Sequence, residues 1–121
     1  MLEDVLRDEP SLSGDAIVVR GGELRCNPVM RSFEQCWQLN GFWGLTVWHD
    51  PDLSVFELWD GVRQLSGYGS VRTARVAELD RNGFQVLPTF GERHYSIVTD
   101  GAPDLRICQL LDDSFNQALR R

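Results

Sequence analysis

The segment GFQVLPTFGERHYSIVT, residues 83–99, predicts a β-hairpin whose two strands fold back about Gly91-Glu92. A two-residue loop with Gly first is typical of a type II′ turn. In this register Thr89 lies opposite His94. Pro88 falls at a ladder position where it cannot donate a hydrogen bond, so we expect either a longer loop or an edge position for the first strand.

Side chains alternate along each strand of this hairpin, so its two faces differ in chemistry. One face is apolar and predicts core packing (Phe84, Val86, Pro88, Phe90, Tyr95 and Ile97). The other face mixes polar and apolar side chains (Gln85, Leu87, Thr89, His94, Ser96 and Val98). His94 is one of only two histidines in the chain, which makes this second face the first candidate for a functional site.

The composition is that of an ordinary globular domain, with 121 residues, of which 42% are hydrophobic and 25% charged. The net charge of −6 disfavours a nonspecific nucleic-acid binder, whose surface is basic, but leaves room for a small basic cleft. All twelve basic residues are arginine, which excludes a Schiff-base lysine and a Walker-type phosphate lysine. No apolar run approaches the roughly 20 residues that a membrane helix needs.

The three cysteines indicate in which cellular compartment the chain resides. Cys26, Cys36 and Cys108 make an odd count without metal-ligand spacing. A reduced chain in the cytoplasm is the simplest interpretation. The acidic first residues lack the basic and apolar regions of a signal peptide. Two distant histidines without a paired carboxylate motif predict no metal site.

The N-terminal part of the chain predicts an arm and a first strand. Residues 1–14 indicate a loose or briefly helical arm ahead of a single domain, 15–121. The apolar run 16–20, closed by Gly21-Gly22, is typical of a buried strand. Arg20 is unusual at the end of such a strand, and it forms either a structural ion pair or an anion-binding site.

The middle of the chain predicts two helices around a central strand. Asn27-Pro28 indicates a helix start, and Asn40-Gly41 a left-handed C-cap. Residues 42–48 are apolar on both faces, as in a central strand. A second helix begins either at Asp50 or at the capping box that starts with Ser54.

The last part of the chain completes the predicted topology. Residues 71–79 predict a strand, 105–111 fit a strand or a helix, and 112–119 predict a helix. The order strand, helix, strand, helix, three strands and a C-terminal helix indicates an α+β domain with a single mixed sheet, helices covering at least one face. A right-handed crossover would make the first two strands parallel and bring Arg20 and His49 to one edge of the sheet.

The candidate site combines acid–base groups with anion-binding groups. The candidates for catalysis are His94, Thr46 and Tyr95, and those for phosphate or ligand binding are Arg20, Gly21, Arg93 and His49. Histidine is the natural acid or base near neutral pH, and arginine binds phosphate or carboxylate. Because His94 and Tyr95 are adjacent in a strand, they point to opposite faces and cannot both line one pocket.

Two resemblances bear on function. The segments 20–22, 41–47 and 94–95 follow the patterns R-G-G, G-x-x-G-[LI]-[ST]-V and H-Y, and resemble a set of small uncharacterised bacterial proteins. More distantly, an arginine closing the first strand and a threonine on the second are similar to ADP-ribosyltransferase-like toxin domains. That resemblance implies that Arg20 binds the phosphate of NAD and that Thr46 orders the site.

The same resemblance implies a glutamate that stabilises the ribosyl cation. The chain has no E-x-E motif, and Glu78 or Glu92 would have to supply this group. Apart from NAD, the sequence predicts no cofactor.

Two hypotheses of function follow. The first is a small cytoplasmic bacterial enzyme, toxin-like, acting on a nucleotide or RNA phosphate in a toxin–antitoxin or phage-defence pair. It requires Arg20 and His94 to open into one shared hollow. The second is a non-catalytic module that docks a protein partner, an antitoxin or another copy of the chain. Its docking surface would be an exposed aromatic rim (Trp43 or Trp48, Trp59 and Tyr68).

Overall fold

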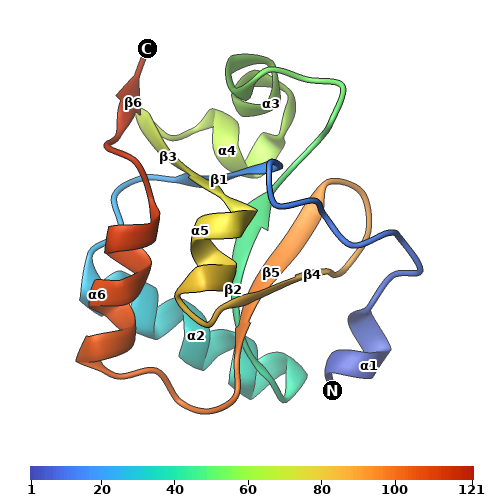
Figure 1. Cartoon of the computed structure of the whole chain (residues 1–121), viewed down its shortest axis with the longest axis vertical. Coiled ribbons are helices and arrows are strands. Elements are labelled where there is room, and N and C mark those ends of the chain that lie inside the picture. Colours follow the sequence, from blue (N-terminus) through green and yellow to red (C-terminus); the bar gives the residue numbers. More distant parts are fainter.

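A single antiparallel sheet, with strand order β4-β5-β2-β1-β3-β6, forms the centre of the computed structural model, which describes all 121 residues (Figure 1). The strands are β1 (Ile17–Gly21), β2 (Trp43–Trp48), β3 (Ser70–Arg75), β4 (Gln85–Pro88), β5 (His94–Thr99) and β6 (Leu119–Arg120). The helices are α1 (Leu2–Val5), α2 (Cys26–Asn40), α3 (Val55–Gly61), α4 (Arg63–Ser66), α5 (Val76–Arg81) and α6 (Leu105–Ser114). The predicted α+β class with one sheet is confirmed. None of these helices has the length and apolar character that crossing a bilayer requires.

The hairpin of β4 and β5 has the predicted register, which places Pro88 opposite Tyr95. The predicted two-residue loop is wrong. The N–H of Thr89 donates to the carbonyl oxygen of His94 at 3.2 Å, and residues 90–93 form the loop beyond this pair. β4 is an edge strand of the sheet, as the position of the proline requires.

The N-terminal arm lies along the outer edge of β4. After α1, Leu6 forms a bridge with Thr89. The N–H of Arg7 donates to the carbonyl oxygen of Pro88 at 3.1 Å. Because the backbone of Pro88 faces the arm, its missing N–H removes no bond to β5. The arm therefore covers part of an edge that would otherwise expose unpaired backbone groups.

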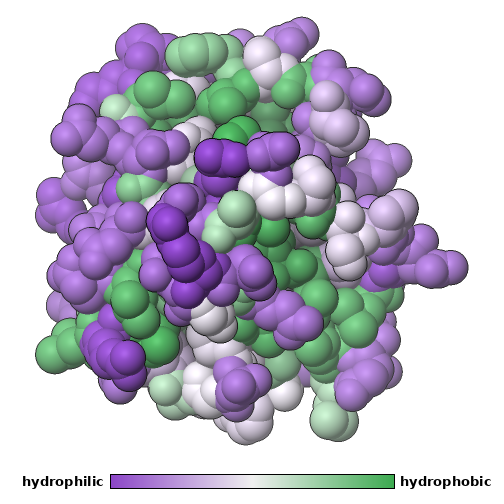
Figure 2. Space-filling model, in the orientation of Figure 1, coloured by the Kyte–Doolittle hydropathy of each residue, from purple (hydrophilic) through white to green (hydrophobic).

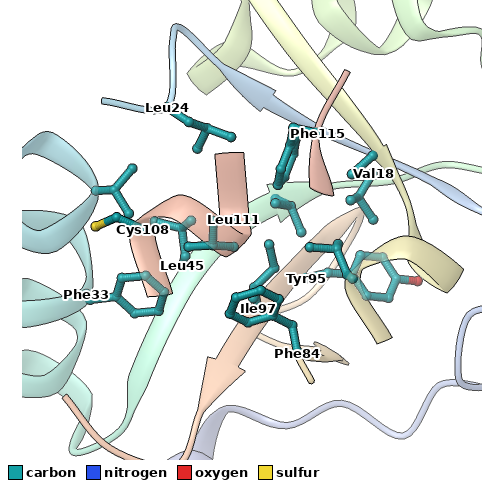
Figure 3. Packing of buried hydrophobic residues seen from close by; sticks show 14 residues of the cluster. Val18, Leu24, Phe33, Leu45, Phe84, Tyr95, Ile97, Cys108, Leu111 and Phe115 are labelled. Carbon is teal, nitrogen blue, oxygen red and sulfur yellow. The ribbon is translucent and has the colours of Figure 1, made fainter. Parts of the chain in front are cut away.

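The main hydrophobic core lies between one face of the sheet and the helices α2, α5 and α6. Sheet residues Leu45, Tyr95 and Ile97 pack there with Phe33 of α2 and Leu111 of α6 (Figure 3). The predicted apolar face of the hairpin thus forms core for Phe84, Tyr95 and Ile97, whereas Phe90 in the loop is exposed.

A smaller cluster covers part of the opposite face. Leu58 and Trp59 of α3 and Leu65 of α4 pack on Val19 and Val71 of the sheet. α3 begins after Ser54, and both hydrogen bonds of the predicted capping box are present. The choice between the two predicted helix starts is therefore settled in favour of the capping box.

The predicted parallel pairing of the first two strands is wrong, and the sheet is not mixed. β1 and β2 are antiparallel and pair at Val19 and Trp48. The 15-residue helix α2 extends over about 22 Å. In Figure 1, α2 descends from the end of β1 to the far end of the sheet, and β2 rises from there back toward β1. Arg20 and His49 consequently do not share an edge of the sheet.

Two further segments differ from the prediction. The strand expected over 71–79 ends at Arg75, and α5 follows at once, because Leu79 on a helix reaches the core. The helix expected over 112–119 ends at Ser114, and Leu119 instead pairs with Val71 in β6. The ambiguous segment 105–111 is helical, with Asp104 as its N-cap.

α2 starts at Cys26, slightly earlier than Asn27-Pro28 indicates, and it ends as predicted, at Gly41 with φ of 76°. Cys26 forms a disulfide with Cys108 of α6. The expectation of three reduced thiols is therefore wrong, and only Cys36 is free. Sequence spacing did not reveal the pair because 82 residues separate its members.

Candidate functional site

Three adjoining pockets lie around the polar side of β2 and β5. Their volumes are about 360, 340 and 300 Å³. His94 lines all three, while Arg20 and Thr46 line two of them. We call the two pockets that contain Arg20 the Arg20 pockets. The guanidinium of residue 20 and the imidazole of residue 94 thus share a hollow, the arrangement that the first hypothesis requires.

The Arg20 side chain fills a gap between β1 and β2. The two strands part after Val19 and Trp48, and a continued ladder would place Gly21 opposite Thr46. Arg20 Nη1 donates instead to the carbonyl oxygen of Thr46 at 2.7 Å. Arg20 Nη2 donates to Ser32 Oγ on α2 at 3.3 Å.

No carboxylate neutralises Arg20. The ion pairs in the structure involve the N-terminus or other arginines (Arg25, Arg72, Arg75, Arg81, Arg93, Arg120 and Arg121). Neither of the Arg20 pockets is lined by an aspartate or a glutamate. Burial lowers the pKa of Arg20, which the nearby Tyr68 partly offsets, yet a guanidinium remains charged at neutral pH. Of the two roles predicted for Arg20, the structural ion pair is absent.

His94 belongs to a chain of hydroxyl groups. Its Nε2 lies 3.1 Å from Thr46 Oγ1, and its Nδ1 lies 3.0 Å from Thr89 Oγ1. Thr89 Oγ1 in turn lies 2.8 Å from Ser96 Oγ. Trp48 and Phe90 contact the imidazole edge-to-face, with ring centroids 4.9 and 5.0 Å away.

Burial of His94 lowers its pKa, because an apolar surrounding disfavours the charged imidazolium. Near neutral pH the ring is therefore neutral, with one nitrogen donating and the other accepting. Thr46 connects this neutral base to the cation, since its backbone oxygen binds Arg20 and its hydroxyl binds His94. The arrangement combines an anion-binding group with a proton acceptor.

Two of the other predicted residues point away from this arrangement. Tyr95 packs in the main core on the opposite face of the sheet, as the alternation from His94 predicts. His49 Nδ1 lies 2.8 Å from the carbonyl oxygen of Ile17, and its ring contacts Tyr95 edge-to-face. Both residues are outside the Arg20 pockets.

Gly21 and Arg93, the other two residues predicted to bind a ligand, lie closer to Arg20 and His94. Gly21 lines the smaller of the Arg20 pockets, beneath the ring of Tyr68. Arg93 Nε donates to Asp50 Oδ2 at 2.8 Å and lines the neighbouring pocket with His94. Hydrogen bonds from the N–H of Asp52 and from Arg93 lower the pKa of Asp50, so Arg93 has a carboxylate partner where Arg20 has none.

Sequence reasoning did not identify the contribution of α2. The largest pocket is lined by a stripe of its residues (Ser32, Gln35, Cys36, Leu39 and Asn40). Their spacing of three and four places them on one side of the helix, which was a usable signal. Cys36 is half-buried in this stripe, and burial raises the pKa of its thiol, so it is a poor nucleophile.

No group of three or more His, Cys, Asp or Glu side chains is placed to hold a metal ion. The ADP-ribosyltransferase-like resemblance implies a glutamate that stabilises the ribosyl cation, with Glu78 and Glu92 as candidates. Glu78 instead pairs with Arg81 on α5, and Glu92 lines only the neighbouring pocket. Neither glutamate lines an Arg20 pocket.

Comparison of the chain with protein-family models, with curated proteins and with solved structures finds no significant match. Function is therefore inferred from the residues of the Arg20 pockets.

Proposed function

We propose that this protein is a small bacterial enzyme that acts on a nucleotide or RNA phosphate, with the phosphate held by Arg20. One observation carries the proposal: a half-buried arginine opens into a pocket without any carboxylate to neutralise it. A buried positive charge is stabilised when an anion binds beside it. The hydroxyls of Ser32 and Thr46 add neutral polar partners for such an anion.

His94 supplies the proton acceptor in this proposal. Because its imidazole is neutral near pH 7, it accepts a proton without first losing one. The attacking oxygen, from water or a ribose hydroxyl, forms the new bond to phosphorus as the bond to the leaving oxygen breaks. Its proton passes to Thr46 Oγ1, whose own proton moves to His94 Nε2, and the leaving oxygen takes a proton from solvent.

We propose that this activity makes the protein the toxin of a toxin–antitoxin or phage-defence pair. Expression of the wild-type protein in bacteria should then inhibit growth. Arg20→Ala and His94→Ala should each abolish the inhibition while circular dichroism stays unchanged. Arg31→Ala is the matched control, since Arg31 is an exposed arginine of α2 outside the site.

A direct assay complements the growth experiment. Purified wild-type protein should cleave RNA or a nucleoside phosphate, and Arg20→Ala should lower the rate by at least about 100-fold, as loss of one charge-stabilising group does. Harmless expression together with no turnover and no phosphate binding would contradict the proposal.

A specific observation favours a second candidate, a protein-interaction module. Trp37 stacks on Trp43 with ring centroids 4.9 Å apart, yet Trp37 is 46% exposed. Leu39, two residues later in α2, is 82% exposed. Figure 2 likewise shows hydrophobic residues reaching the surface between hydrophilic ones on one face of the molecule. If the partner is a second copy, sedimentation will show a dimer that Trp37→Ser dissociates.

A further inference from the structure

The smaller of the Arg20 pockets has two aromatic walls. It is lined by Arg20, Trp48, Gln64 and Tyr68, among others, and its volume is about 300 Å³. That volume lies at the lower end of the range for small-molecule sites. The pocket places aromatic surface directly beside Arg20, the cation that binds the phosphate in the proposed function.

Tyr68 is fixed in position although much of its ring is open. A Cβ atom on Gly21 would lie 2.2 Å from Tyr68 Cδ2, so the ring packs directly on the glycine backbone. Trp59 Nε1 donates to the carbonyl oxygen of Tyr68 at 3.1 Å and holds the chain from below. The side chain nevertheless remains 48% exposed. A rigid aromatic ring with an open surface loses little entropy when a flat group stacks on it.

Trp48 and Gln64 complete the pocket. Trp48 packs against the smaller hydrophobic cluster and contacts His94 edge-to-face, which holds its indole in place. Gln64 is exposed, and its amide offers both a donor and an acceptor. Flat aromatic surface with an amide nearby suits a nucleobase, which presents a π-face and a polar edge.

We propose that Trp48 and Tyr68 form a stacking subsite for the base of a nucleoside phosphate whose phosphate lies on Arg20. This inference rests on the proposed function and adds that the site recognises the base of its nucleotide or single-stranded RNA substrate as well as the phosphate. It also explains the glycine at position 21, because any side chain there would displace the ring of Tyr68.

The test compares ligands with and without a base by isothermal titration calorimetry. The probes are ribose 5-phosphate and the four common nucleoside 5′-monophosphates. At least one nucleotide should bind the wild-type protein roughly 5- to 150-fold more tightly than ribose 5-phosphate, the effect of one base–aromatic stack. Tyr68→Ala should remove that difference and leave the affinity for ribose 5-phosphate unchanged, whereas Tyr68→Phe should retain it.

Gly21→Ala provides an independent variant, because it leaves the ring in the chain but displaces it. It should lower nucleotide affinity as Tyr68→Ala does. Equal binding of nucleotides and ribose 5-phosphate, or equal weakening of both by Tyr68→Ala, would overturn the subsite alone. Absence of ribose 5-phosphate binding, or binding that Arg20→Ala does not weaken, would overturn the proposed function and the subsite with it.

Discussion

Replacing Thr89 by valine removes one hydroxyl from the middle of the His94 network while conserving the shape of the side chain. Thr89 is 0% exposed, and its Oγ1 lies within 3.0 Å of His94 Nδ1 and 2.8 Å of Ser96 Oγ. Thr89→Val therefore leaves two polar atoms without this partner. Each buried unsatisfied group costs about 1–3 kcal/mol.

Water in the pocket can replace part of the loss at His94, but Ser96 is only 2% exposed. We therefore expect Thr89→Val to lower the free energy of unfolding by about 2–4 kcal/mol. Urea denaturation measures this value as a shift of the midpoint at constant slope. Thr99→Val is the control: its hydroxyl donates to the Gly101 carbonyl in an exposed position, and its effect should stay within about 0.5 kcal/mol.

A double-mutant cycle with Ser96→Ala makes the test sharper. Removing both hydroxyls leaves no unsatisfied serine, so the double variant should be more stable than additivity predicts, by about 1–2 kcal/mol. Additive effects, or a Thr89→Val variant within about 0.5 kcal/mol of the wild type, would refute the view that this network is buried and fully bonded.

Two further predictions concern stability. Burial lowers the pKa of His94 below its ordinary value of 6.5, so the unfolded state binds more protons than the folded state. The stabilisation present above that pH should therefore decline as the pH falls toward the folded-state pKa. His94→Gln should reduce the dependence of the free energy of unfolding on pH between about pH 7.5 and 5.5, and an unchanged dependence would contradict this prediction. The disulfide of Cys26 and Cys108 closes a loop with a sequence separation of 82, worth about 4.5 kcal/mol in the chain-entropy model. Reduction should lower the melting temperature of the wild type and of Cys36→Ser alike, and leave Cys26→Ser/Cys108→Ser unaffected; equal stability with and without reductant would refute this.

Local signals predicted several elements correctly from the sequence. The β4–β5 register follows from a period of two with apolar residues on one face, because a slip by one residue would expose the whole set. The left-handed cap at Gly41 and the capping box at Ser54 depend on backbone groups within a few residues. The opposite orientation of His94 and Tyr95 follows from the same alternation.

Other features depended on contacts between distant parts of the chain. The direction of β2 relative to β1 depends on where α2 packs, which no local pattern encodes. The sequence predicted a strand that continues to Leu79, and the helical form of residues 76–81 follows from the position that the core offers to Leu79. The pairing of Cys26 with Cys108 likewise depends on how α2 and α6 pack together.

The sequence by itself determined which residues could carry the chemistry: an arginine at the end of a buried strand and a histidine on the polar face of a hairpin. Only the tertiary structure decided that they meet. β1 parts from β2 after Val19, so the Arg20 side chain takes a carbonyl oxygen that a backbone N–H would otherwise bind. This gap between β1 and β2 arises from packing between elements, and for that reason no local pattern of amino acids predicts it.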